Sequence, residues 1–219
     1  MTAGTLPLIA LLFLAATPPA GPVQDPQAIV ERAEIDFERG RLAEAVAGFN
    51  RVAALVPSVA PTLWQRGIAL YYLGRFEECA AQFAAFHTID PTDLENASWH
   101  FLCVARSQSV ERARTTLLKA GPDPRILRTE IYDMLRGRLS PDELIAMATK
   151  SVPIVQFYAH LYVGLYAEAQ GDRPTAMTHI ATAAGDQYRS IGGFMNVVAQ
   201  VHLARLRSTV ADPASSNVQ

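Results

Sequence analysis

Near the middle of the first half, the chain reads Arg66-Gly67-Ile68-Ala69-Leu70-Tyr71-Tyr72-Leu73-Gly74-Arg75. The glycine that ends this apolar stretch has a counterpart 34 residues earlier, at Gly40. Four further pairs keep the same step: Ala45 with Cys79, Phe49 with Phe83, Val52 with Phe86, and Pro57 with Pro91. Thirty-four residues is the length of a repeated helix-turn-helix unit, with small, aromatic and helix-ending residues at the places where such a unit needs them. The period therefore predicts an all-α fold of stacked helical hairpins.

The first two repeats are complete in the sequence. Asp25 and Pro26 are placed as the N-cap and first residue of the opening helix, because proline is tolerated at that position. Repeat one is expected to contain helices up to residue 39 and over 42–55, and repeat two helices over 62–73 and 76–89. Thr92 and Glu95 have the spacing of a capping box and predict the start of the next helix.

The second half keeps the repeat less regularly. The third repeat lacks a turn glycine near residues 107–108, and segments 125–136 and 140–151 lack the repeat pattern, so they are predicted to form an inserted helical pair. The repeat pattern then reappears. Four residues lie 97 positions after Gly67, Gly74, Cys79 and Phe83 of repeat two, respectively: Gly164, Gly171, Ala176 and Ile180. One more unit is expected over residues 156–185, followed by a capping helix over 188–207.

Small residues recur where the hairpins should touch. Gly67 and Gly164 occupy equivalent places in their repeats. One 34-residue unit buries too little apolar surface to offset its backbone entropy, so neighbouring units must cover each other. We expect these glycines to mark close contacts between helices, where a larger side chain would clash.

The sequence divides into four segments: a signal peptide or N-terminal anchor (1–20), a linker (21–27), an α-solenoid domain (28–207) and a disordered tail (208–219). The apolar run over 6–16 is short for a bilayer core of about 30 Å, which favours a secretory signal peptide and an exported, periplasmic or secreted protein. An uncleaved membrane anchor is the alternative. No cysteine follows the run, so the sequence has no lipobox.

Composition limits the function classes. The chain has 19 basic and 21 acidic residues and a net charge of −2, so it offers no basic surface for nucleic acid. The two cysteines, Cys79 and Cys103, both fall at helix positions expected to be buried. We expect two buried thiols, with a single disulfide as the alternative in an exported chain.

Motifs for catalysis are missing from the sequence. None of the usual nucleotide-binding, hydrolase or zinc-protease patterns occurs, and no histidine has metal-ligand spacing except His100 with Cys103. That pair would support a hydrolase, but core packing is the simpler interpretation. We therefore predict no enzyme activity, no cofactor, no metal and no small-molecule substrate.

The decapeptide at 66–75, the Asp90-Pro91 stop and the segment from Tyr158 to the Gly171-Asp172 turn resemble tetratricopeptide-repeat (TPR) proteins. Within them, the chain is similar to the small bacterial NlpI-like envelope proteins. That resemblance implies a right-handed superhelix acting as a non-catalytic, dimeric adaptor. The missing lipobox departs from that group and leaves its outer-membrane anchor and its particular partners unassigned.

The geometry of such repeats directs the first helix of each hairpin toward a concave groove, where aromatic side chains suit a peptide or protein partner. The expected binding residues are Trp64, Gln65, Ile68, Tyr71, Tyr72, Trp99, Arg106, Tyr158 and Tyr162. Two alternatives stay open: the chain itself fills part of the groove, or the groove is the contact of a homodimer and the protein is a self-associating structural subunit.

Overall fold

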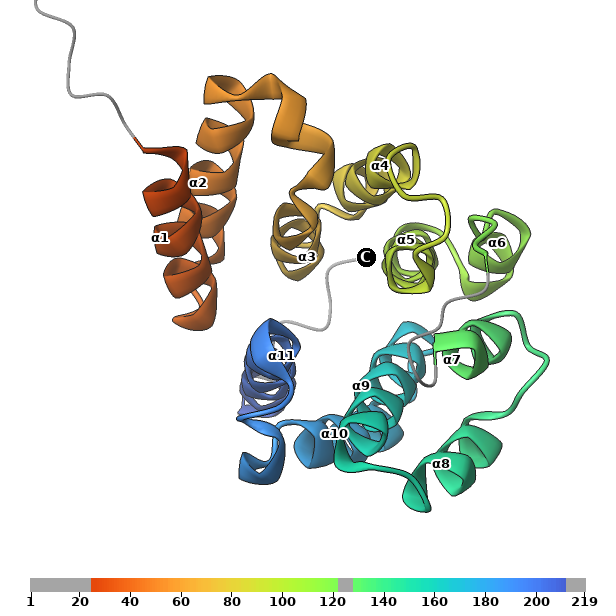
Figure 1. The fold of residues 1–219 in the computed structure, drawn as a ribbon. Coiled ribbons are helices and arrows are strands. Elements are labelled where there is room, and N and C mark those ends of the chain that lie inside the picture. The colour runs from red at the N-terminus through yellow and green to blue at the C-terminus, as the bar shows by residue number, and fades with distance from the viewer. Residues whose placement is uncertain (1–24, 122–127, 212–219) are drawn as a thin grey trace, which may run out of the picture.

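The computed structural model describes residues 25–121 and 128–211, and every regular element within them is helical. The helices follow one another around an open arc, and the last of them returns toward the first (Figure 1). The α-helices are α1 (Pro26–Glu38), α2 (Leu42–Leu55), α3 (Trp64–Tyr72), α4 (Phe76–His87), α5 (Leu94–Ser107), α6 (Val110–Thr115), α7 (Arg128–Leu135), α8 (Pro141–Thr149), α9 (Pro153–Ala169), α10 (Arg173–Ala183) and α11 (Gly193–Ala211). Two short 3₁₀ helices join them, η1 (Pro57–Thr62) and η2 (Asp186–Tyr188). The predicted all-α class is confirmed.

The first repeat begins as the sequence indicates. The Asp25 carboxylate accepts a hydrogen bond of 2.9 Å from the Gln27 amide, and Pro26 is the first helical residue. Helix α1 therefore starts two residues before the expected domain boundary at residue 28. Helix α2 has the predicted bounds, whereas α3 starts at Trp64 rather than at residue 62, because the chain first makes the η1 turn.

The predicted capping box at Thr92 is wrong. Asp93 is the N-cap of α5, and its carboxylate accepts from the amides of Glu95 and Asn96 at 2.8 and 3.0 Å. The Thr92 hydroxyl instead donates to Asp90 at 2.7 Å. An aspartate one position later satisfies two orphan N–H groups of the first turn, so it replaces the threonine as the cap.

The hairpin turns of three repeats share one backbone feature. Gly40, Gly74 and Gly171 have φ angles of +72°, +74° and +80°, a left-handed conformation that suits glycine. They lie between α1 and α2, α3 and α4, and α9 and α10. The third hairpin, α5 with α6, turns through Gln108 at a φ of −133° and needs no glycine.

The later segments differ from expectation at their ends. The inserted pair forms as α7 and α8, and the predicted start of its first helix at residue 125 lies outside the described residues. The final helix starts at Gly193, five residues after the predicted position, because η2 and a turn precede it, and it continues to Ala211. Residues 1–24, with the predicted signal peptide, and the tail beyond 211 also lie outside the described part.

Close packing at the repeated glycines is confirmed. A Cβ atom on Gly67 would lie 2.7 Å from Cε2 of Phe83, and one on Gly164 would lie 2.7 Å from Cγ1 of Ile180. Both distances are well inside van der Waals contact, so any larger residue forces the neighbouring helix to move.

The two cysteines are joined, which corrects the expectation of two free thiols. Cys79 on α4 and Cys103 on α5 form a disulfide with Cα atoms 5.8 Å apart, and both residues are fully buried. That separation is ordinary for a disulfide. Since α4 and α5 pack side by side, the 24-residue spacing brings the two sulfur atoms together.

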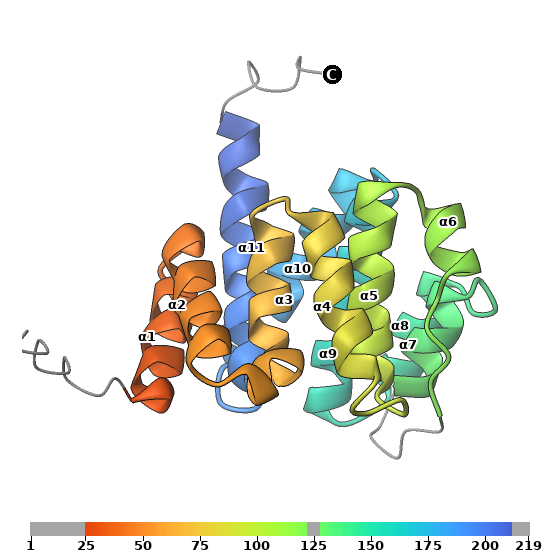
Figure 2. The same ribbon diagram turned by 90° about the horizontal axis from the view of Figure 1, so that it is seen from above.

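Helix α11 closes the arc, in the gap between α1 and α10 (Figure 1). It packs on α10 and α1, and the ring of Phe194 stacks on Phe37 of α1 with centroids 5.3 Å apart. In the second view α11 runs between α1–α2 and α3 along much of the assembly (Figure 2). Part of the inner surface of the arc is therefore covered by the chain's own last helix.

Candidate functional site

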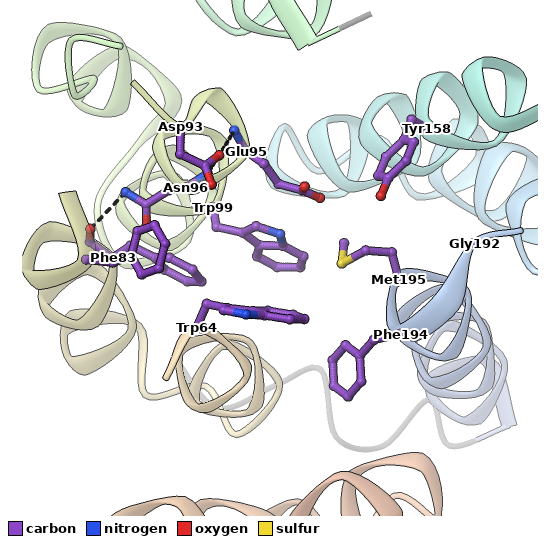
Figure 3. A pocket seen from close by; sticks show the side chains of 11 residues that line it. Trp64, Phe83, Asp93, Glu95, Asn96, Trp99, Tyr158, Gly192, Phe194 and Met195 are labelled. Atoms are coloured by element: carbon purple, nitrogen blue, oxygen red, sulfur yellow. Dashed lines mark hydrogen bonds between the residues drawn. The ribbon is translucent and has the colours of Figure 1, made fainter. Parts of the chain in front are cut away.

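A pocket of about 420 Å³ opens beside α11 on the inner side of the arc. Side chains from α3, α4 and α5 face side chains from α9 and the start of α11 across it (Figure 3). The lining residues are Trp64, Phe83, Phe86, Asp93, Glu95, Asn96, Trp99, Tyr158, Gly192, Phe194 and Met195. Its volume falls in the range that encloses a small ligand or a few side chains of a larger one.

Aromatic rings form the walls. The Trp99 ring lies nearly parallel to Phe83, with centroids 6.1 Å apart and an interplanar angle of 16°. Trp64 contacts Phe194 edge to face at 5.2 Å, and thereby joins α3 to α11. These are the two tryptophans of the chain, so both of its indoles line one pocket.

The acidic groups of the pocket lie at the N-terminal end of α5. Asp93 is held as the helix cap, and Glu95 accepts a hydrogen bond of 3.0 Å from the hydroxyl of Tyr162 on α9. Among the eleven residues that line the pocket, the charged ones are these two acids. The lining therefore combines two acidic side chains with aromatic and apolar walls.

Two buried polar atoms of residues at this site have no hydrogen-bond partner within the described part of the chain. The indole Nε1 of Trp99 is one, on a residue that is 2% exposed. The Oδ1 atom of Asn96 is the other, although the Nδ2 atom of the same side chain donates to the Phe83 carbonyl at 3.0 Å. A buried donor or acceptor without a partner costs about 1–3 kcal/mol. Both atoms are buried beneath the pocket surface, so they are an internal cost of this packing.

The predicted binding residues separate into two groups. Trp64, Trp99 and Tyr158 line the pocket. The others contribute to the interior or to contacts between helices: Ile68, Tyr71, Tyr72 and Tyr162 are buried, Gln65 donates to Glu34 at 3.0 Å, and Arg106 pairs with Glu168 at 2.8 Å.

The buried tyrosines belong to a polar cluster that attaches α11 to the rest of the arc. Tyr72 shares a 3.0 Å hydrogen bond with Nδ1 of His202, and Arg205 donates to the Tyr72 carbonyl at 2.5 Å. Tyr71 donates to Glu168 at 3.4 Å. Burial raises the pKa of both phenols and lowers the pKa of His202 to about 4, so these groups are neutral near pH 7.

The residues proposed for a hydrolase are not arranged as a nucleophile and base. The Cys103 sulfur is committed to the disulfide with Cys79. Burial, with a smaller contribution from His87, lowers the pKa of His100 to about 4. This pair therefore presents no thiolate and no imidazolium at neutral pH.

Two histidines that the sequence spacing does not pair lie together in the structure. His160 of α9 and His179 of α10 bring their Nδ1 atoms to 2.9 Å, although they are 19 positions apart. Burial lowers the pKa of both residues.

Within residues 25–121 and 128–211, no group of three or more potential ligands is arranged to hold a metal ion. Phe194 and Met195 were also missed as pocket residues, because their positions depend on where α11 returns.

No protein-family model matches this chain, and no curated protein matches its sequence. None of the helices in the described part is both long enough and apolar enough to cross a membrane.

Proposed function

We propose that the protein is a non-catalytic scaffold of the tetratricopeptide type, and that it holds a segment of a partner protein in the pocket beside α11. The observation that carries this proposal is the placement of Trp64, Trp99 and Tyr158 around one cavity on the inner surface. Amphipathic aromatic side chains in a partly enclosed pocket are typical anchors of protein recognition.

The repeated architecture supports the scaffold class. Three hairpins turn through a left-handed glycine at the equivalent position, and two equivalent glycines make the close contacts between helices. Stacked hairpins of this kind present an inner surface to partners. We propose in addition that the hairpins form a right-handed TPR superhelix and that the protein is an adaptor like the NlpI-like proteins.

We place the protein outside the cytoplasm, in the periplasm or secreted, and assign residues 1–20 as its signal peptide. The Cys79–Cys103 disulfide supports this location, because such bonds persist in oxidising compartments and are rare in the cytosol. An uncleaved N-terminal anchor predicts the same compartment, and N-terminal sequencing of the mature protein distinguishes the two.

Self-association is the rival function. The large apolar side chains that are exposed in the described fold come from different helices and connections: Ile35, Leu55, Ile89, Met147, Val152 and Ile191. Apolar residues scattered singly are normal on a monomer, whereas an interface needs a contiguous patch. The pocket therefore supports a partner segment better than the surface supports a second copy.

Site-specific photo-crosslinking in the source organism tests the proposal. A benzoylphenylalanine at Tyr158, which lines the pocket, should give an adduct with a partner protein, whereas the same group at the exposed Thr178 of α10 should not. Trp64→Ala should reduce the Tyr158 adduct in a variant whose circular dichroism still shows the helical fold. Adducts of the chain only with itself would instead favour the self-associating subunit.

A further inference from the structure

We infer that the groove between α1 and α11 binds a basic amphipathic helix of a partner protein. The groove adjoins the aromatic pocket at Phe194, which lines both, but its other residues are different. The inference therefore goes beyond the proposed function and adds a second binding surface. Three features lead to it: the shape of the groove, its apolar residues and its row of carboxylates.

The groove forms where the last helix returns beside the first. Its volume is about 500 Å³, in the range of sites that enclose part of a ligand. The lining residues are Glu31, Glu34, Ile35, Glu38, Phe194 and Val197. Four of them belong to α1 and two to α11, so neither helix makes the groove alone (Figure 1).

The apolar part of the lining is open to solvent. Ile35 is 40% exposed although it is a large hydrophobic residue, and Phe194 and Val197 are half-buried. The stack on Phe37 and the edge contact with Trp64 hold the Phe194 ring in place. A partner that covers these apolar side chains removes their surface from water, and this burial supplies most of the affinity.

Three glutamates lie along the α1 side of the groove. Glu31, Glu34 and Glu38 are three and four positions apart, so they share one face of the helix. Two of them accept hydrogen bonds from uncharged amides: Gln27 donates to Glu31 at 3.2 Å, and Gln65 donates to Glu34 at 3.0 Å. An amide partner leaves the negative charge of a carboxylate in place.

Two arginines in α1 and in the turn after it pair with a different carboxylate. Arg32 lies 3.5 Å from Asp36, and both line a separate hollow between α1 and α2. Arg41 also donates to Asp36, at 2.9 Å. None of the six residues that line the groove is basic. The three carboxylates are therefore not neutralised within the lining.

The charge and the spacing identify the occupant. The row of carboxylates covers about 10 Å of α1, since each residue advances the helix by about 1.5 Å. Lysines or arginines on one side of a partner helix repeat with the same spacing, whereas same-side residues of an extended strand are about 7 Å apart. An exposed ion pair changes affinity by at most about fivefold, so the glutamates select the partner and the apolar residues hold it. Both requirements describe a basic amphipathic helix in a groove.

The ends of the chain itself lack the matching charge. Residues 1–24 and 212–219 contain no lysine or arginine. A segment from either end would therefore leave the glutamates without a cationic partner. This argument favours a separate protein as the occupant.

Fluorescence anisotropy with a labelled peptide and the intact chain tests the inference. The probe is a peptide of leucine, alanine and lysine of about 15 residues, long enough to form a helix on binding, with leucines on one face and lysines beside them. It should bind saturably. A peptide of the same composition, with the leucines spread around the helix, should bind at least tenfold more weakly. Raising the salt concentration should weaken binding of the first peptide.

Paired glutamate variants locate the charge. Glu31→Gln with Glu38→Gln should raise the dissociation constant of the probe about fivefold, because both exposed carboxylates line the groove. Glu44→Gln with Glu77→Gln removes the same charge from exposed positions on α2 and α4 and should have no such effect. Circular dichroism establishes that each variant keeps the helical fold.

A second pair of variants locates the apolar contact. Ile35→Ser should weaken binding of the probe at least fivefold, because it removes exposed apolar surface from the groove. Leu55→Ser, at a position on α2 that is 48% exposed, is the matched control and should bind the probe as the unmodified protein does.

Three results would overturn the inference. Equal binding of the two peptides would show that net charge alone attracts them, and this comparison needs no variant. Equal loss of affinity in the two double glutamate variants would place the binding surface elsewhere. A dimer that Ile35→Ser dissociates in sedimentation would assign the groove to a second copy. The proposed function fails separately, because it depends on the Tyr158 crosslink in the aromatic pocket and not on these peptides.

Discussion

Tyr72 and His202 lie 130 positions apart and share a hydrogen bond of 3.0 Å between the phenolic oxygen and Nδ1. The bond joins α3, in the second hairpin, to α11, the last helix, and both residues are almost fully buried. The Arg205 guanidinium adds a second link from α11 to the Tyr72 carbonyl. Together these contacts keep the last helix inside the arc.

Stability should fall as the solution is acidified. Burial lowers the pKa of His202 and of His100 to about 4, against an ordinary value of 6.5 in the unfolded chain. Between these values the unfolded state binds more protons, so the free energy of unfolding decreases as pH falls from about 6.5 toward 4. Each histidine contributes up to about 3 kcal/mol to this loss. Urea titrations at several pH values measure it.

His202→Gln is the matched variant for this effect. Glutamine keeps a polar side chain near Tyr72 but binds no proton, so the stability of this variant should depend less steeply on pH than that of the unmodified protein. His100→Gln should flatten the same curve independently. Parallel curves for the unmodified protein and both variants would contradict the assignment of the acid sensitivity to these two residues.

Gly67→Ala should destabilise the protein. Its added Cβ would lie 2.7 Å from the buried ring of Phe83, so the ring would have to shift and lose its present packing. Overpacking of this kind costs about 1–3 kcal/mol and works against the higher helix propensity of alanine, about 1 kcal/mol. Gly67→Leu should be worse. The urea midpoint reports the change.

A double variant tests the cause. Phe83→Leu leaves room beside residue 67, so Gly67→Ala with Phe83→Leu should be less destabilised than the sum of the single changes. If the two effects simply add, the close contact between α3 and α4 is not the source of the cost.

The disulfide should contribute to stability. Cys79 and Cys103 are 24 positions apart, and closing a loop of that length stabilises the folded state by roughly 3 kcal/mol in the chain-entropy account. Reduction with dithiothreitol in urea should lower the unfolding midpoint of the unmodified protein. A variant with both cysteines replaced by alanine should not respond to the reductant. Two titratable thiols in the unreduced, denatured chain would refute the bond.

The histidine pair offers a test by nuclear magnetic resonance. Burial is the main cause of the lowered pKa of His160, and the neighbouring His179 lowers it further. His179→Gln removes that second charge while keeping a polar side chain, so the pKa of His160 should rise. No change in the His160 titration would show that the two rings, 2.9 Å apart at Nδ1, do not interact.

The sequence alone was sufficient for the local structure. The 34-residue step placed the first hairpins, the proline-marked start of α1 and the full extent of α2 were predicted correctly, and the glycines at the turns have the expected role. These features depend on residues close together in the chain: a proline that lacks an N–H, a glycine that lacks a Cβ, or apolar side chains at regular spacing. The capping box predicted at Thr92 was wrong, because Asp93 is the N-cap of α5.

The tertiary structure decided which groove residues meet. Trp64, Trp99 and Tyr158 remain around a cavity, whereas Tyr71, Tyr72 and Tyr162 are buried, and repeat spacing assigns all six to the same surface. Helix α11 covers Tyr72 through His202 and Arg205, and it adds Phe194 and Met195 to the pocket. Tyr71 and Tyr162 are covered instead by contacts among α4, α5 and α9, such as those of both rings with Trp99. A helix's sequence records which of its faces is apolar but not which distant helix will cover that face, because that depends on the summed geometry of every hairpin between them.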